Sequence, residues 1–152
     1  MKGMHHSTVI QTPRGSIVHY KTKSGEIRAK IEWNPEFGTQ KTEQYSRAQK
    51  YVDSSVLRLS SPYVPLLTGA LEKSGTLCTD IGSGEVIWNT PYARYQYYER
   101  VMVGSPPKQV TNIPLKYHGG GLRGGFWFER MKADHKSEII AGAAKIAGGA
   151  AK

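Results

Sequence analysis

Two side chains in this sequence could act as nucleophiles, Cys78 and Ser83. Catalysis by either residue type needs a neighbouring base and a third group that orients the base. Ser83 lies in Gly-Ser-Gly and not in Gly-x-Ser-x-Gly, so the sequence predicts no nucleophile elbow. Cys78 lies in a predicted strand without an adjacent motif, where a buried and unreactive cysteine is the commoner case. Neither residue predicts a nucleophilic active site.

Histidine and carboxylate side chains give an equally weak signal for a metal site. His135 and Glu138 are three residues apart on a predicted helix and could form one edge of a site, but no third ligand is placed beside them. His118 is far from both in the sequence. We therefore expect no metal and no cofactor, and interpret His135 as a residue at the edge of an apolar helix face.

General acid–base chemistry and phosphate binding find no better support. Glu26, Glu32, Glu85 and Glu99 occupy ordinary solvated positions at predicted strands or helix ends. The glycine-rich stretch 118–125 lacks Gly-Lys-Ser/Thr, so it does not predict a phosphate-binding loop. The sequence predicts a protein that is not an enzyme.

Two β-hairpins are predicted from alternation and turn residues. The first joins strand 16–22 to strand 27–33, because apolar and charged residues alternate strictly from Ile27 to Trp33. The second joins the apolar runs 70–78 and 85–89 through a turn in which Gly82 and Gly84 can adopt positive φ.

Two helices are predicted from apolar residues at steps of three and four. The first covers 42–59, with Thr39 or Thr42 as its cap, and the second begins at Phe126 or Trp127 and ends at 147. The stripe of the first helix consists of Tyr45, Ala48, Val52, Val56 and Leu59. The stripe of the second consists of Phe128, Met131, His135, Ile139, Ala143 and Ile146.

These elements predict an α+β fold, with an antiparallel sheet of about four to six strands and both helices packed on it. Residues 1–15 are expected to be a flexible arm, 16–149 a single domain and 150–152 a tail. The domain includes a long Gly- and Pro-rich loop, 104–125, which is either a flexible linker or an arm that orders against a neighbouring subunit.

Aromatic residues are concentrated after Pro91, which suits the first turn of a short helix. Tyrosine is enriched at protein interfaces, because its ring is apolar and its hydroxyl is polar. The segment 92–98 could therefore face a partner, or its rings could cap the core. Trp33, Trp88 and Trp127 are placed where a core would need them.

Composition limits the partners that this chain could have. The 152 residues carry a formal charge of +9, and the segment between Glu99 and Glu129 has basic residues but no acidic one. A basic surface attracts polyanions, but no base-reading motif accompanies this charge. One cysteine excludes an internal disulfide, and no apolar run is long enough to span a membrane. We also expect no signal peptide.

Three blocks of this sequence resemble a family of tailed-phage minor capsid proteins, which are small head–tail connector or tail-completion components. The blocks are the run from Pro62 to Gly75, the run from Asn89 to Tyr98, and the run from Phe126 to Lys136. They keep their order, and the similarity covers about Ile31 to Gly149. None of the blocks is a catalytic motif.

The resemblance implies a virion structural protein at the head–tail junction, made in the host cytoplasm. It implies a homo-oligomeric ring, expected to be sixfold, between portal-side connector or head-completion proteins and tail terminator or tail tube proteins. Phage DNA would pass through the lumen, and no membrane is involved. The alternative is a standalone basic nucleic-acid-binding protein.

The resemblance also assigns roles to residues of this chain. The expected interface residues are Tyr92, Arg94, Tyr95, Tyr97, Tyr98, Lys108, Lys116 and Arg123. The block residues with an expected structural role are Pro65, Thr68, Gly69, Leu71, Trp127 and Phe128.

Overall fold

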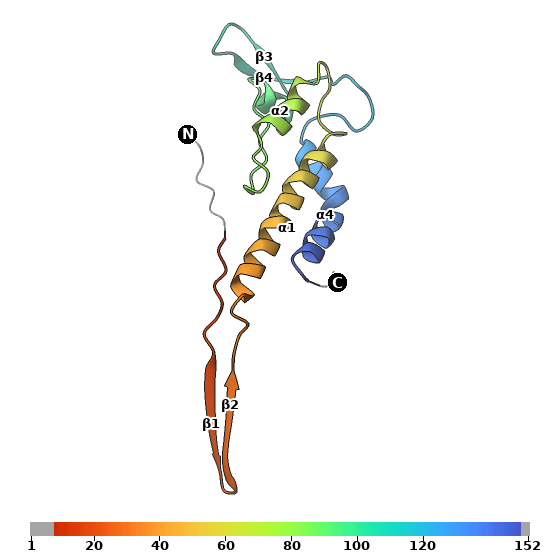
Figure 1. The fold of residues 1–152 in the computed structure, drawn as a ribbon. Helices are drawn as coiled ribbons and strands as arrows, with labels where there is room; N and C mark the ends of the chain where they lie inside the picture. The colour runs from red at the N-terminus through yellow and green to blue at the C-terminus, as the bar shows by residue number, and fades with distance from the viewer. Residues whose placement is uncertain (1–7, 150–152) are drawn as a thin grey trace.

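A computed structural model describes residues 8–149 of the chain, and within them the chain forms an elongated molecule with four helices and four strands (Figure 1). In chain order the elements are β1 (Ser16–Thr22), β2 (Gly25–Ile31), α1 (Phe37–Ser60), α2 (Ala70–Cys78), α3 (Ala93–Tyr97), β3 (Arg100–Val103), β4 (Gln109–Pro114) and α4 (Trp127–Ile146). The predicted α+β class is confirmed, as are the long helix and the C-terminal helix.

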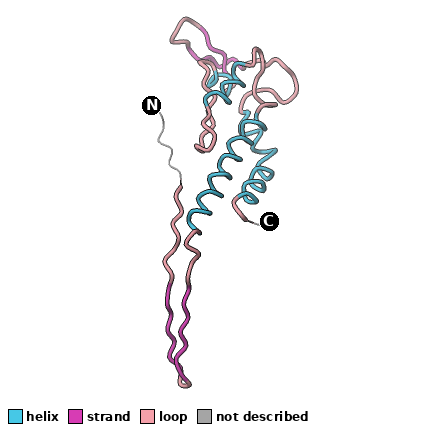
Figure 2. Tube along the Cα trace, viewed as in Figure 1, coloured by secondary structure: helices cyan, strands magenta, loops and turns pink. Residues whose placement is uncertain are grey.

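The prediction of one sheet beneath both helices is wrong. The strands form two separate two-stranded antiparallel sheets, β1–β2 and β3–β4, which lie at opposite ends of the molecule with the helices between them (Figure 2). The long helices pack against each other, and the main apolar cluster joins Val56 of α1 to Met131 and Ile139 of α4. Helix–helix contact, and not sheet–helix contact, therefore buries the two predicted stripes.

The helix α1 begins five residues before its predicted start and keeps most of its predicted apolar stripe. Ala48 and Val56 are buried, Val52 and Leu59 are half-buried, and Tyr45 is exposed. The predicted caps do not cap this helix, because the residue before its first turn is Glu36.

Residues at the N-terminal end are tied to the start of α1 by hydrogen bonds. Thr42 Oγ1 accepts a bond from the backbone N–H of Ile10 at 2.9 Å, and the Gly38 N–H donates to Thr12 Oγ1 at 3.0 Å. The predicted flexible arm 1–15 is thus anchored at residues 10–12, while residues 1–7 and the predicted tail 150–152 lie outside the described residues.

The first predicted hairpin is confirmed, although its second strand covers Gly25–Ile31 and not 27–33, and the hairpin covers no core. Every residue of β1 and β2 is exposed, and Trp33 beyond β2 is 43% exposed rather than buried. The hairpin projects beyond the first turn of α1, with its tip pointing away from the rest of the chain (Figure 1).

The second predicted hairpin is wrong, because residues 70–78 form helix α2 and residues 85–89 form no strand. Gly69 precedes the helix with φ +76°, and Leu71, Ser74 and Gly75 face inward at helical spacing. Gly75 lies so close to Trp88 that a Cβ at this position would be 2.6 Å from Trp88 Nε1. The small residue allows the chain after α2 to return along the helix.

The predicted loop 104–125 is partly regular. A turn after β3 brings residues 109–114 back as β4, which pairs with β3 around an irregularity between Arg100 and Met102. The turn 104–108 and the segment 115–126 between β4 and α4 contain neither helix nor strand.

Candidate functional site

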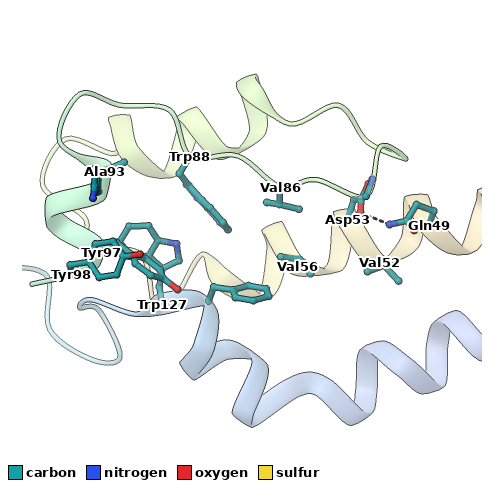
Figure 3. Close-up of a pocket in the computed structure, with 13 residues that line it drawn as sticks. Gln49, Val52, Asp53, Val56, Val86, Trp88, Ala93, Tyr97, Tyr98 and Trp127 are labelled. Atoms are coloured by element: carbon teal, nitrogen blue, oxygen red, sulfur yellow. Dashed lines mark hydrogen bonds between the residues drawn. The ribbon is translucent and has the colours of Figure 1, made fainter. Parts of the chain in front are cut away.

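An open, mostly apolar groove of about 550 Å³ lies beside the C-terminal half of α1 (Figure 3). Its walls come from α1, the chain at 84–88, the short helix α3 and the first turn of α4. The apolar side chains in it are Val52, Val56, Val86, Trp88, Ala93, Tyr97, Trp127 and Phe128. Ligands usually bind to proteins in concave, mostly apolar sites of this size.

Trp127 forms the floor of the groove and is only 2% exposed. Its ring packs edge-on against Trp88 at 5.9 Å and against Tyr97 at 4.6 Å between centroids. Its indole Nε1–H is buried, and no acceptor among the described residues lies within hydrogen-bonding distance of it. Buried donors are nearly always paired, so this unpaired donor in the core is an exception.

The short helix α3 is held against the start of α4 by backbone bonds. The Phe126 N–H donates to the Tyr97 carbonyl at 2.9 Å, and the Gly125 N–H donates to Glu99 Oε1 at 3.2 Å. Glu99 has φ +59°, which reverses the chain immediately after the tyrosine segment. These contacts fix the wall that carries Arg94, Tyr97 and Tyr98.

Asp53 holds the opposite wall in place, although no pattern in the sequence marks this residue as important. The side chain is 2% exposed, and its Oδ2 accepts bonds from the Gly82 N–H at 2.7 Å and from the Gly84 N–H at 3.1 Å. Its Oδ1 accepts a bond from Gln49 Nε2 at 2.8 Å. One carboxylate therefore ties the turn after α2 to the middle of α1.

The predicted interface residues of the tyrosine segment divide into two groups. Arg94, Tyr97 and Tyr98 line the groove, with Arg94 and Tyr98 exposed and Tyr97 half-buried. Tyr92 and Tyr95 lie outside this groove, in smaller depressions on either side of α3. Among residues 8–149, no side-chain hydrogen bond or ion pair involves Arg94, so its guanidinium is available to a partner.

The predicted basic residues of the loop are not part of the groove. Lys108 and Lys116 are exposed, and neither lines it. Arg123 is half-buried, and its Nη1 donates to the Val64 carbonyl at 2.6 Å and to the Ser61 carbonyl at 3.3 Å. Arg123 therefore has a structural role, because these bonds hold the loop before α4 against the end of α1.

The block residues with an expected structural role lie in two places. Trp127 and Phe128 line the groove, the first buried and the second half-buried. The other four, Pro65, Thr68, Gly69 and Leu71, form the entry to α2 and line a depression of about 320 Å³ that also contains Tyr92. Two of the blocks that carry the family resemblance thus meet in space.

Tyr117 ties the segment after β4 to α3, and its hydroxyl donates to the Gln96 carbonyl. Burial raises the pKa of Tyr117 to about 12 from its ordinary value of 10.0, and the negative charge of Glu99 adds to the rise. A phenol whose pKa is higher in the folded state than in the unfolded state stabilises the fold below pH 10. That contribution is lost as the pH rises from about 10 to about 12.

We expect Tyr117→Phe to flatten the alkaline loss of stability. At neutral pH the variant should lose about 1 kcal/mol, because one hydrogen bond is removed. Between pH 8 and pH 11, however, its urea midpoint should fall less than that of the wild type. Some slope will remain, since a hydrogen bond to Asp134 also raises the pKa of Tyr63. If the urea midpoints of the wild type and of Tyr117→Phe fall equally over this pH range, Tyr117 is not the residue that causes the alkaline loss of stability. Tyr45→Phe, at an exposed position, is the control.

Other kinds of site receive no support within residues 8–149. No group of three or more histidine, cysteine or carboxylate side chains in this part of the chain could hold a metal ion. None of its helices is both long enough and apolar enough to cross a membrane. The expected burial of Cys78 in a strand is wrong, because this residue ends α2 and carries a free and exposed thiol.

Comparisons with protein-family models, with curated proteins and with solved structures find no match to this chain.

Proposed function

We propose that this chain is a structural protein of tailed-phage particles, which joins other copies of itself and neighbouring proteins at the head–tail junction. The observation that carries this proposal is the amount of apolar surface that the chain leaves uncovered in two separate places. One is the groove of about 550 Å³, and the other is the fully exposed β1–β2 hairpin. Monomeric proteins rarely expose contiguous apolar surface of this kind, whereas assembling proteins do.

The composition of the groove also favours a protein partner over a small molecule. Aromatic residues and arginine are enriched at the centres of protein interfaces, and Trp88, Trp127, Tyr98 and Arg94 all line this groove. The resemblance of three sequence blocks to minor capsid proteins supports the same role. In that role, copies form a ring between portal-side connector or head-completion proteins and tail terminator or tail tube proteins, around a lumen for DNA.

Particle composition is the direct test of this function. Particles purified from a lysate of the phage that encodes the chain should contain it in a fixed number of copies, as measured by quantitative mass spectrometry. Electron microscopy of the same particles should place it at the junction between head and tail. Particles that are complete and infectious without the chain would overturn the proposal.

We expect the double variant Arg94→Ala/Tyr98→Ala to fold but to assemble poorly. Both side chains are exposed on the groove, so their removal should change the free energy of unfolding by less than about 1 kcal/mol. If they are interface anchors, each contributes about 2 kcal/mol, and self-association should weaken by at least about tenfold. Sedimentation velocity measures the association, and thermal unfolding measures the fold.

Tyr45→Ala is the matched control for that variant. Tyr45 and Tyr98 are both 52% exposed, but Tyr45 lies on α1 outside the groove. Its replacement should leave self-association unchanged. An equal loss of association in Tyr45→Ala would show that the groove is not the site of self-association. Tyr97 is unsuitable for this test, since its contact with Trp127 makes it part of the core.

A second candidate function, nucleic-acid binding, has one observation in its favour. The register of the β1–β2 hairpin places Lys21, Arg28 and Lys30 on a single face. A two-stranded ribbon can enter the major groove of DNA. Two acidic neighbours oppose this charge, however, because Glu26 pairs with His19 and Glu32 pairs with Lys30. Micromolar binding to DNA at physiological salt by a monomeric chain would favour this function over assembly.

A further inference from the structure

The β1–β2 hairpin has one apolar face and one charged face. Directly paired residues of an antiparallel ladder lie on the same face, and successive pairs alternate between faces. The apolar face of the hairpin consists of Val18, Tyr20, Ile27, Ala29 and Ile31. The opposite face carries the pairs His19–Arg28 and Lys21–Glu26, with Ile17 opposite Lys30. This amphipathic pattern is that of a ribbon with one side in water and one side against another surface.

The described residues 8–149 do not cover the apolar face. Tyr20 is 63% exposed and Ile27 is 59% exposed, although the two form a cross-strand pair. A two-stranded hairpin is marginally stable by itself, and exposed apolar strands promote association with other chains. The hairpin tip points away from α1 in Figure 1, so the face does not reach the groove of the same molecule.

The groove has the features that such a ribbon would need. It is open along α1, and it is lined largely by apolar side chains. The outer edges of β1 and β2 carry backbone carbonyls that pair with no further strand of the described chain. The exposed guanidinium of Arg94, which lines the groove, could donate to one such carbonyl or to the Tyr20 hydroxyl.

We propose that the apolar face of the β1–β2 hairpin of one copy docks in the groove of a second copy. The proposal rests on the assembly function above and names the partner of the groove. Each chain supplies one hairpin and one groove, so the two surfaces occur in equal numbers in any assembly. Because hairpin and groove are different surfaces, the contact is head-to-tail, and repeated copies close into a ring if the rotation between them closes.

Distance favours an exchange between copies over folding back within one. A seven-residue strand pair is about 23 Å long, at 3.3–3.4 Å per residue. The hairpin precedes α1, which begins at Phe37. Asp53 and Val56 of the groove lie about 24–29 Å from Phe37 along that helix, at 1.5 Å per residue. The ribbon thus extends in one direction from the start of α1 and the groove lies in the other.

Two isoleucines of the same hairpin provide a matched pair of variants. Ile27 lies on the apolar face and Ile17 on the charged face, and they are 59% and 57% exposed. Threonine suits strands, so either replacement should keep the hairpin. We expect Ile27→Thr to weaken self-association at least tenfold in sedimentation velocity, and Ile17→Thr to leave it within about twofold. Equal effects of the two variants would overturn the proposal.

Disulfide trapping between copies tests the contact itself. In a Cys78→Ser background, a chain with Ile27→Cys is mixed under oxidising conditions with a chain carrying Gln49→Cys, a position on the groove wall. The mixed disulfide should form in preference to either homodimer, and Ile17→Cys in place of Ile27→Cys should form it at least tenfold more slowly. No preference for the mixed disulfide, or a wild-type chain that stays monomeric at all concentrations, would overturn the docking.

These outcomes separate the docking from the function on which it rests. If particles contain the chain but Ile27→Thr associates normally and no mixed disulfide forms, the assembly role stands and the hairpin is not the occupant of the groove. If the mixed disulfide forms but particles lack the chain, the docking stands and the virion role fails.

Discussion

Trp127→Ala should lower the free energy of unfolding by about 3–5 kcal/mol, the range measured for large aromatic side chains removed from cores. Trp127 is 2% exposed and contacts two further aromatic rings, Trp88 and Tyr97. Its removal therefore leaves a cavity where the walls of the groove meet. A domain of this size is stable by roughly 5–15 kcal/mol, so the variant should lose a large share of its stability.

Trp33→Ala is the control, because it removes the same side chain from an exposed position. Trp33 is 43% exposed and contacts one ring, that of Phe37, at 5.2 Å between centroids. We expect it to cost less than about 1 kcal/mol. Urea unfolding followed by circular dichroism compares the two variants with the wild type. Similar losses in both would show that Trp127 is not the centre of the core.

Asp53→Ala should cost about 3 kcal/mol, and it should also release one wall of the groove. The substitution removes the acceptor for the Gly82 and Gly84 N–H groups and for Gln49 Nε2, and hydrogen bonds to a charged group contribute about 1.5–3 kcal/mol each. Water can replace part of this loss, since the turn itself is not fully buried. The expected cost is therefore nearer to one such bond than to three.

Protease sensitivity reports the release of that wall separately from global stability. Glu85 lies in the turn that Asp53 holds, and a glutamate-specific protease should cleave after it several times faster in Asp53→Ala than in the wild type. Asp53→Asn is the matched control, because its amide oxygen can accept both backbone bonds while its NH₂ group donates to Gln49. It should cost about 1 kcal/mol and leave cleavage nearly unchanged. Cleavage of Asp53→Ala at the wild-type rate would contradict the role of Asp53 in holding this wall.

The sequence predicted the elements that carry a strong period and missed those that depend on context. The stripes of α1 and α4 and the alternation of β2 were sufficient to place these elements. In α2, Leu71, Ser74 and Gly75 share a face, but two of them are small or polar, so the helical period was not apparent. The segment therefore resembled a strand until its packing against Trp88 was visible.

The groove could be predicted only in part, because it is assembled from four segments that are far apart in the chain. Its aromatic members stood out by residue type, and three of the predicted interface residues, Arg94, Tyr97 and Tyr98, do line it. Asp53 gave no signal, since a single aspartate on a helix is usually solvated. Its role depends on a turn about thirty residues later, a relation that periodicity within α1 does not encode.

The exposed thiol of Cys78 makes this chain suited to counting by fluorescence. It is the one cysteine in the sequence, and it lies at the end of α2, on neither the hairpin nor the groove. A maleimide dye would therefore attach once per chain without any substitution. Stepwise photobleaching of single labelled particles would then read out how many copies each one holds.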